Sequence, residues 1–514
     1  MDRPGRAPVR GRASDPSATP VRVKTSSCLV TAAVLVAATA AACSSTKNDA
    51  VAPGVGGPAG VDGGTEAGVD PASYPVVVIG AEPQRNGDAA KGYRALVNEA
   101  YVPCGIPLTA YAQVYPTVAP EDTVPGREGK NANLAYNFTS MTTKDGVDLV
   151  TSNCLTCHAG RINGKLVVGL GAADGDFTND AAQQIQTTGF VGALLTDPKE
   201  RAEWSKWKER VDTVAPYSVL STRGPNPADG FTAVLFAHHD PKTMAWSSTP
   251  LMAVPPPVDL PVDVPPWWRM KKKSSMFYVG GGRGDHARIM MTASILCTSS
   301  VAESRAIDAY FADIRTWIAS LDAPAYPFAI DHALADRGKP VFDATCSRCH
   351  GTYGGGGAFP NRLISTEEIG TDPVLASGTA QFAGPFVDWF KNSFFGEIAR
   401  LEPQQGYVAP PLDGIWATAP YLHNGSVPTL AALLDSTQRP VYWTRTFDSN
   451  DFDQAGVGWN FTKLDHGKAT ETVDKAKRAL YDTTRLGYAN AGHTFGDALS
   501  AADRSAVIEY LKTL

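Results

Sequence analysis

The chain has 514 residues, too many for one hydrophobic core, so two or more domains are expected. Hydrophobic residues make up 43% of it and charged residues 19%, which is typical of a soluble globular protein. The formal net charge is −6, and removal of residues 1–42, with six basic and two acidic residues, would leave −10. A chain this acidic argues against a nucleic-acid partner.

Residues 1–42 have the form of a secretory signal. An Arg-rich start precedes an apolar run from Cys28 to Ala42, which is too short to span a bilayer as a mature anchor. Cys43 follows three alanines, as at a bacterial lipoprotein cleavage site, so we predict a periplasmic protein lipid-anchored at Cys43. Plain cleavage after an alanine is the alternative. Residues 43–74, rich in Gly, Ala and Pro, are predicted to be a flexible tether.

Two five-residue strings share one spacing: Cys154-Leu-Thr-Cys157-His158 and Cys346-Ser-Arg-Cys349-His350. This is the spacing of c-type haem attachment. Two thiols three residues apart can both form thioethers with the porphyrin edge, and the adjoining imidazole becomes the proximal iron ligand. A zinc site would need each pair to find partners in the other half of the chain. The strings therefore predict two covalently bound haem c groups.

Two cysteines of the mature chain remain after the haem strings and Cys43, namely Cys104 and Cys297. In an oxidising compartment they could form a disulfide, and two separate buried thiols are the alternative.

A basic run at residues 269–273 is interpreted as a solvated strip, with pairing to haem propionates or docking of an electron partner as alternatives. The glycine cluster that follows, residues 280–286, is predicted to be a tight loop packed close to a porphyrin.

Apolar residues recur at helical spacing over residues 303–321. A second helix is expected over residues 331–344, directly before the second haem string. Pro428 predicts the first turn of a further helix, and the capping pattern at Ser500 predicts a terminal one.

A proline-rich break at residues 322–327 marks a domain boundary. We therefore predict two tandem cytochrome c-like haem domains, residues 75–325 and 326–514, in a mainly α fold with long loops and few short strands.

Residues 418–426, Thr-Ala-Pro-Tyr-Leu-His-Asn-Gly-Ser, together with two separated haem strings, resemble the bacterial dihaem cytochrome c peroxidase and methylamine-dehydrogenase-maturation superfamily. Four further segments are most similar to its branch of rubber-oxygenase-like dihaem c-type cytochromes: residues 265–268, 282–286, 349–353 and 492–496. The resemblance implies a mainly helical protein with two haem domains, and a calcium ion between the domains for which it assigns no residues.

The ligands of the second haem follow partly from what the chain lacks. Every methionine precedes Cys346, so the second predicted domain contains none to serve as a distal ligand, and we expect a lower reduction potential than Met/His ligation gives. The histidines after the second string are His423, His466 and His493. The resemblance favours His493 opposite His350, with His423 as the alternative.

The first haem has His158 as its proximal ligand, and no histidine follows until His238. His238, His239 and His286 remain open as distal ligands, although surface or hydrogen-bonding roles are commoner for such residues. We expect an open sixth position with apolar or aromatic walls. Phe277, Tyr278 and His286 are the candidate residues of this catalytic pocket.

The expected function is that of an exported oxidoreductase, peroxidase-like, which reacts with hydrogen peroxide or dioxygen at the first haem and transfers electrons through the second. An external cytochrome is the expected electron donor. The alternatives are a dihaem electron carrier with no open site and a haem-dependent oxygenase of an organic substrate.

Overall fold

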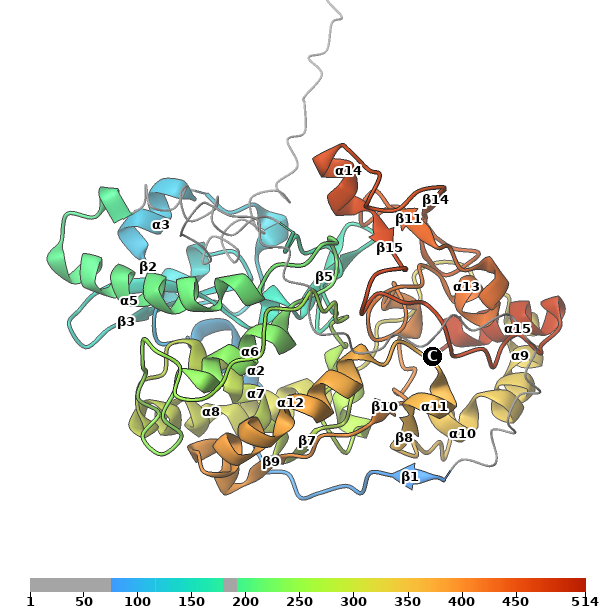
Figure 1. The fold of residues 1–514 in the computed structure, drawn as a ribbon. Helices are drawn as coiled ribbons and strands as arrows, with labels where there is room; N and C mark the ends of the chain where they lie inside the picture. Colours follow the sequence, from blue (N-terminus) through green and yellow to red (C-terminus); the bar gives the residue numbers. More distant parts are fainter. Residues whose placement is uncertain (1–74, 116, 179–191) are drawn as a thin grey trace, which may run out of the picture.

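The computed structural model describes residues 75–115, 117–178 and 192–514. The signal sequence, the tether and the lipid site predicted for residues 1–74 lie outside the described residues. Helices account for 40% and strands for 13% of the structure, so the fold is mixed helical with small sheets. Figure 1 shows two lobes side by side, one built mostly from the first half of the chain and one from the last third.

The described helices are short except for four of fourteen or more residues. In chain order they are α2 (Ala89–Asn98), α3 (Leu108–Val114), α5 (Pro198–Val214), α6 (Ala228–Ala237), α7 (His286–Met290), α8 (Val301–Ser320), α9 (His332–Thr345), α10 (Ser347–His350), α11 (Thr366–Ile369), α12 (Val374–Lys391), α13 (Leu430–Leu434), α14 (Asp474–Ala479) and α15 (Ala501–Lys512).

The strands have two to five residues and pair antiparallel. The three-stranded sheets have the orders β1 (Val77–Val78)-β8 (Arg362–Ser365)-β10 (Gly406–Val408), β2 (Ile106–Pro107)-β4 (Asp148–Ser152)-β3 (Phe138–Thr142) and β14 (Thr462–Leu464)-β11 (Tyr442–Thr444)-β15 (Tyr481–Asp482). The two-stranded pairs are β5 (Ala159–Ile162) with β6 (Lys165–Val168), β7 (Gly282–Gly284) with β9 (Ala399–Leu401), and β12 (Phe452–Asp453) with β13 (Gly458–Trp459).

Helix α8 is the central element of the first lobe. The helix predicted over residues 303–321 is confirmed, and its apolar stripe, Ile307, Phe311, Ile314 and Ile318, is buried. Helix α2 packs along α8 so closely that a Cβ on Gly92 would lie 2.0 Å from the carbonyl oxygen of Asp313. Only glycine permits this approach of two helix backbones.

Cys104 and Cys297 form a disulfide that links two distant parts of the first lobe. The bond lies in an apolar cluster with Trp204, Trp207 and Val211. The sequence left a disulfide and two separate buried thiols as alternatives, and the structure has the disulfide.

The second lobe is built around α9, confirmed close to its predicted bounds, and α15, which begins where the Ser500 capping pattern predicts. Gly338 of α9 sits against the backbone of Ala506 on α15, where a Cβ would lie 1.9 Å from the Ala506 oxygen. Ser500 caps α15 by accepting from the Asp503 N–H at 3.1 Å. The helix predicted to begin at Pro428 begins at Leu430 instead, because the Thr429 hydroxyl is the group that caps it.

Part of the later sequence packs into the first lobe. Helix α12 and the segment after it contribute Trp389, Phe390, Phe394 and Phe395 to the core that contains α8. Residues 282–284, predicted as a tight loop, instead form β7, which pairs with β9 of this segment. Conversely, Trp268 belongs to the core of the second lobe. The domain boundary at residues 325/326 stays a prediction, because each lobe contains residues from the other side of it.

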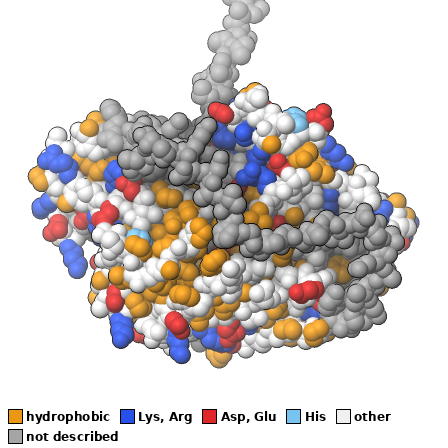
Figure 2. All heavy atoms as spheres, viewed as in Figure 1, with side chains coloured by type: hydrophobic (Ala, Val, Ile, Leu, Met, Phe, Trp, Pro, Cys, Tyr) orange, Lys and Arg blue, Asp and Glu red, His pale blue; other side chains and the backbone are white. Residues whose placement is uncertain are grey.

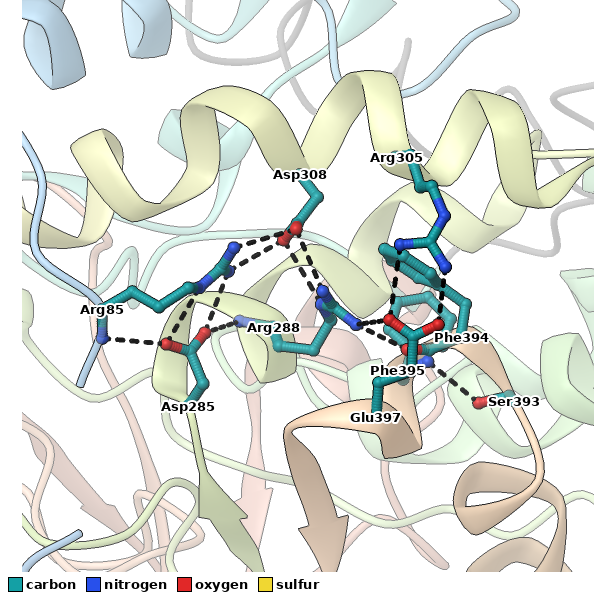
Figure 3. Close-up of polar contacts among 9 residues, drawn as sticks. All are labelled: Arg85, Asp285, Arg288, Arg305, Asp308, Ser393, Phe394, Phe395 and Glu397. Carbon is teal, nitrogen blue, oxygen red and sulfur yellow. Dashed lines mark hydrogen bonds and ion pairs between the residues drawn. The ribbon is translucent and has the colours of Figure 1, made fainter. Parts of the chain in front are cut away.

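An ion-pair network attaches the start of the folded chain to the first lobe (Figure 3). Arg85 contacts two carboxylates: Asp285, the N-cap of α7, at 3.0 Å, and Asp308 on α8 at 2.8 Å. Arg288 on α7 pairs with the same Asp308 at 3.0 Å. The Asp308 carboxylate thereby joins helix α7, helix α8 and the extended segment that contains Arg85.

The same network holds the segment after α12. Arg288 donates to the carbonyl of Phe394, and its guanidinium lies 3.9 Å from the centre of the Phe394 ring. Its other neighbour, Glu397, also pairs with Arg305 of α8 at 2.7 Å. Since Arg288 is only 4% exposed, this contact fixes the later segment against α7 and α8.

One face of the first lobe is apolar. Figure 2 shows hydrophobic side chains gathered over α6 and α12 on this face. Phe382 of α12 is 44% exposed. No helix among the described residues is long and apolar enough to cross a membrane.

Candidate haem-binding sites

The first haem string begins with a short helical turn. The N–H groups of Cys157 and His158 both donate to the carbonyl of Cys154, at 3.3 and 3.1 Å. The turn then leads into the β5–β6 hairpin, and Gly169 at its end donates to the His158 carbonyl at 2.8 Å. Both thiols are thereby brought to one side of a single turn.

The second string adopts the same turn. Cys349 and His350 donate to the carbonyl of Cys346 at 3.2 and 3.1 Å. Within the described part of the chain, the four string cysteines form no disulfide. The two strings therefore present the same local arrangement of two free thiols and one imidazole, as covalent haem attachment requires.

His350 is oriented as a metal ligand would be. Its Nδ1 lies 2.8 Å from the carbonyl oxygen of Pro410, which leaves Nε2 as the nitrogen available to a metal. Burial lowers the pKa of His350, against the opposing effect of the Pro410 carbonyl, so the ring is neutral at neutral pH. A neutral imidazole with a fixed tautomer is the form that binds iron.

His493 lies opposite His350. The centres of the two rings are 6.1 Å apart. Two imidazoles bound on opposite faces of one metal, with metal–nitrogen bonds of about 2.0 Å, would have ring centres about 6 Å apart. Burial lowers the pKa of His493 to about 3, and its Nδ1 is buried without a hydrogen-bond partner among the described residues. The two residues fit an iron between them, and the assignment of His493 as a ligand stays a prediction.

A strained loop holds His493 in this place. His493 has a φ of +47°, which is unusual for a residue with a side chain, and Gly492 before it has a φ of +71°. A Cβ on Gly492 would lie 2.1 Å from the carbonyl carbon of Gly370, so only glycine fits against the end of α11. The His493 N–H donates to the carbonyl of Ile369 at 2.8 Å.

The position of α11 depends in turn on a buried ion pair. Arg362 of β8 donates to both oxygens of Glu368 on α11, at 2.7 and 3.0 Å, and both side chains are 2% exposed. Arg362 also lies 3.7 Å from the Cys349 sulfur. The pair thus connects the second string to the helix that supports His493.

The first string has different surroundings. Among the described residues, the ring that contacts the His158 ring is that of Trp267, stacked at 4.8 Å, and no second histidine faces it. Burial lowers the pKa of His158 to about 4. The Asn226 amide donates to the Cys157 sulfur at 3.3 Å. The residues fit a haem with one imidazole ligand, and the opposite side of the metal stays unassigned.

Two of the three histidines left open for the first site have other partners. His238 Nδ1 bonds to the Ser247 carbonyl at 2.8 Å. The ring nitrogens of His239 lie 2.7 Å from the carbonyl oxygen of Leu235 and 3.0 Å from that of Thr298, and the neutral ring can donate to one of them. These contacts are the ordinary hydrogen-bonding roles that the sequence made the likelier interpretation for such residues.

His286, the third, is 1% exposed at the start of α7, and neither ring nitrogen has a hydrogen-bond partner within the described chain. Burial lowers its pKa to about 4, against the opposing effect of the Ser274 backbone, so the ring is neutral and its role as a ligand stays a prediction.

The two aromatic pocket candidates are adjacent in the chain but differ in exposure. Phe277 is 40% exposed and has a φ of +69°. Tyr278 is turned inward and donates to Asp263 at 3.1 Å. Burial raises the pKa of Asp263 to about 7. Among the described residues the ring stacked on His158 is that of Trp267, so the place of Phe277 and Tyr278 in a catalytic pocket stays a prediction.

His423, the alternative second ligand, is buried elsewhere. Its ring stacks on Tyr407 at 4.2 Å and meets Tyr278 edge to face at 6.4 Å. Burial lowers its pKa to about 3. His466, the remaining histidine of this region, pairs at the surface with Asp465 and Glu471.

Sequence reasoning missed several residues around the strings. Trp267, Asn226, Pro410 and Arg362 contact a string histidine or cysteine, yet none is close to a string in the sequence. Trp267 lies in residues 265–268, one of the segments that carry the family resemblance, whereas Asn226, Pro410 and Arg362 carry no signal of their own. In the described regions no group of three or more His, Cys, Asp or Glu residues could hold a metal ion, so the calcium prediction rests on resemblance alone.

Residues 406–444 match a protein-family model described as RoxA-like, cytochrome c-like. The matched segment runs from β10 to β11 and contains Pro410, the partner of His350, and His423. A cytochrome c-like domain is therefore present, and such a domain implies covalently bound haem c. The match supports, in coarse terms, the resemblance to rubber-oxygenase-like cytochromes. Membership of the wider dihaem peroxidase superfamily stays a prediction.

Two uncharacterized proteins of Sinorhizobium fredii are also similar to the chain. Protein y4iM is 33% identical over 205 residues, which are 35% of this chain and 45% of that protein. Protein y4iJ is 30% identical over 249 residues, which are 36% of this chain and 39% of that protein. The chain thus covers less than half of the length of either relative, and their names state no activity.

Proposed function

We propose that the protein is an exported dihaem c-type cytochrome oxidoreductase, peroxidase-like in its chemistry. Bound at Cys154, Cys157 and His158, one haem c would supply an iron able to react with hydrogen peroxide or dioxygen, and a second haem c would supply an iron that exchanges electrons. The two irons would differ because, among the described residues, an imidazole lies opposite His350 and none faces His158.

This asymmetry carries the proposal. The 6.1 Å between the rings of His350 and His493 leaves room for one metal and for no additional ligand. His158 instead has an indole against its ring. His350 is held by the Pro410 carbonyl and His493 by the Gly492–Gly370 contact, so the second site is rigid on both faces. A rigid, saturated metal site suits electron transfer.

The wider setting is part of the proposal. Export to a bacterial periplasm and a lipid anchor at Cys43 would place both haems beside reduced cytochromes, which we propose as electron donors. The disulfide between Cys104 and Cys297 supports an oxidising compartment, where such bonds persist.

Carbon monoxide binding to the reduced holoprotein tests the proposal. We expect two covalent haems per chain, one of which binds carbon monoxide, and oxidation of the reduced protein by hydrogen peroxide. Two haems inert to carbon monoxide, or fewer than two haems, would overturn it. Parallel assays with peroxide and with dioxygen distinguish the two oxidants.

The ligand assignment has a matched pair of variants. His493→Ala should convert the second haem from a low-spin to a high-spin or mixed spectrum and give it carbon monoxide binding. His423→Ala removes another buried imidazole of the same lobe and should leave the spectrum unchanged. The reverse pattern would assign His423 as the ligand.

A dihaem electron carrier is the alternative that His286 favours. His286 is buried, and neither of its ring nitrogens has a hydrogen-bond partner among the described residues. Of the three histidines left open by the sequence, it is therefore the one most available as a second ligand for the first iron. If the wild type binds no carbon monoxide and His286→Ala binds it at one haem, the protein is a carrier with two closed sites.

An oxygenase of an organic substrate is favoured by the apolar face over α6 and α12 (Figure 2). Exposed apolar surface in a soluble protein commonly marks a binding site. An oxygenase would consume dioxygen only when an apolar organic substrate is present, whereas a peroxidase would oxidise a donor cytochrome with peroxide alone.

A further inference from the structure

Three aromatic side chains lead outward from the first haem string. The Trp267 ring stacks on that of His158, with centres 4.8 Å apart and planes at 23°. Trp317 meets Trp267 edge to face at 6.1 Å. Tyr93 lies against Trp317 at 5.1 Å. Each ring is therefore in contact distance of the next.

The three rings come from separate elements, and the backbone holds each in place. Trp267 begins the 3-10 helix Trp267–Lys272. Its backbone N–H donates to the carbonyl of Gly169, at the end of the hairpin that follows the first string, at 2.8 Å. Trp317 lies on α8. Tyr93 lies on α2, beside Gly92, whose close approach to α8 brings the phenol ring onto the indole.

Tyr93, the outermost of the three aromatic rings, reaches the protein surface. The Tyr93 hydroxyl donates to the carbonyl of Pro125 at 2.8 Å in an exposed hydrogen bond. Gly126 covers one edge of the ring, because a Cβ there would lie 3.3 Å from Tyr93 Cε1. Trp267 is buried, whereas Trp317 and Tyr93 are partly exposed. The row of three aromatic rings thus runs from the buried His158 to solvent.

We propose that Trp267, Trp317 and Tyr93 form a one-electron path between the first haem site and the surface at α2, separate from the second haem site. Indole and phenol are the side chains most readily oxidised by one electron. The path rests on the proposed function and would let a small phenol-class reductant supply electrons directly to the first site.

The chemistry balances in two equal rounds. In each round one electron passes from Tyr93 through Trp317 and Trp267 to the haem site, and the Tyr93 hydroxyl proton passes to solvent. The phenol then returns one electron and one proton to Tyr93 and becomes a phenoxyl radical. Two electrons and two protons reduce one hydrogen peroxide to two waters.

Radical trapping in the holoprotein tests the path without an activity assay. Peroxide is added with a nitroso spin trap and no reductant, and adducts are located by peptide mass spectrometry. We expect an adduct at Tyr93 that Trp317→Phe abolishes. Tyr115→Phe, which alters a tyrosine paired with Tyr111 outside the path, should leave the Tyr93 adduct unchanged. A Tyr93 adduct that survives Trp317→Phe, or its absence from the wild type when peroxide oxidises the haem, rejects the path.

A second measurement separates this proposal from the proposed function. Flash-generated tris(bipyridine)ruthenium(III) oxidises the reduced holoprotein from outside, with no need for peroxide reactivity. Oxidation of the haem that carries His158 should be slower in Trp317→Phe than in the wild type and Tyr115→Phe. If peroxide leaves the haem spectrum unchanged but this difference persists, the proposed function fails and the path stands. Equal rates in all three proteins overturn the path.

Discussion

The buried pair of Arg362 and Glu368 allows the cost of one lost ion to be worked out. Both side chains are 2% exposed, and Arg362 donates to both carboxylate oxygens. Removing one partner of such a pair leaves an uncompensated buried charge and costs about 3–5 kcal/mol. Glu368 keeps a second partner, Arg348, at 3.0 Å, so we place Arg362→Met near the lower limit. A loss of about 3 kcal/mol corresponds to roughly a 150-fold change in the folding equilibrium.

Arg348→Met is the matched control. It removes the other guanidinium that pairs with the Glu368 carboxylate, but the Arg348 side chain is 42% exposed. Exposed ion pairs contribute about 0.2–1 kcal/mol. Urea denaturation, followed by circular dichroism, compares the two variants with the wild type at equal slope. Equal costs in the two variants would refute the reasoning from burial.

The same variants carry a local consequence. Glu368 precedes Ile369, whose carbonyl accepts from His493 at 2.8 Å. Loosening α11 should therefore raise the hydrogen-exchange rate of the peptide that contains His493, more in Arg362→Met than in Arg348→Met. Unchanged exchange in both variants would show that the ion pair does not support the His493 loop.

Three further outcomes are expected. Replacing Cys104 and Cys297 by serine should cost about 2–5 kcal/mol in urea denaturation, because their bond closes a long loop, and a reducing agent should destabilise the wild type but not the variant. Arg288→Met should cost about 3 kcal/mol, because it leaves the Phe394 carbonyl and Asp308 short of a buried partner, and a cost below that of an exposed pair would contradict this. Burial raises the pKa of Asp263 to about 7 from an ordinary value of 3.8, so between about pH 4 and 7 the folded protein holds a proton that the unfolded chain releases. Stability should fall as pH rises through this window, and Asp263→Asn should flatten the slope measured by denaturation at each pH.

Local sequence predicted the two haem strings and the helices α8, α9 and α15, but not the long helices α5 and α12. The two strings predict haem attachment because two thiols and an imidazole must lie within five residues to reach one porphyrin. Ile307, Phe311, Ile314 and Ile318 predict α8 because a period of 3.6 residues places them on one face. Both signals lie within a few turns of the chain, so no knowledge of distant segments is needed.

Short elements were less predictable. Residues 282–284 were expected in a loop, but they form a strand because β9 lies beside them in the structure. Such a short strand has too few residues for a hydrophobic alternation, and its pairing partner lies more than a hundred residues later. The choice between a disulfide and two free thiols at Cys104 and Cys297 was open for the same reason: it depends on a distance that neither local sequence contains.

The sequence by itself determined which residues could attach haem and where the helices α8, α9 and α15 run, since spacing and periodicity are local properties of the chain. Only the tertiary structure decided which side-chain rings lie against the histidines of the two haem strings. His493 lies opposite His350 because Gly492 fits against Gly370, and Trp317 and Tyr93 meet because Gly92 brings α2 onto α8. Such contacts join segments far apart in sequence through backbone approaches of a few ångströms, and no periodicity records them.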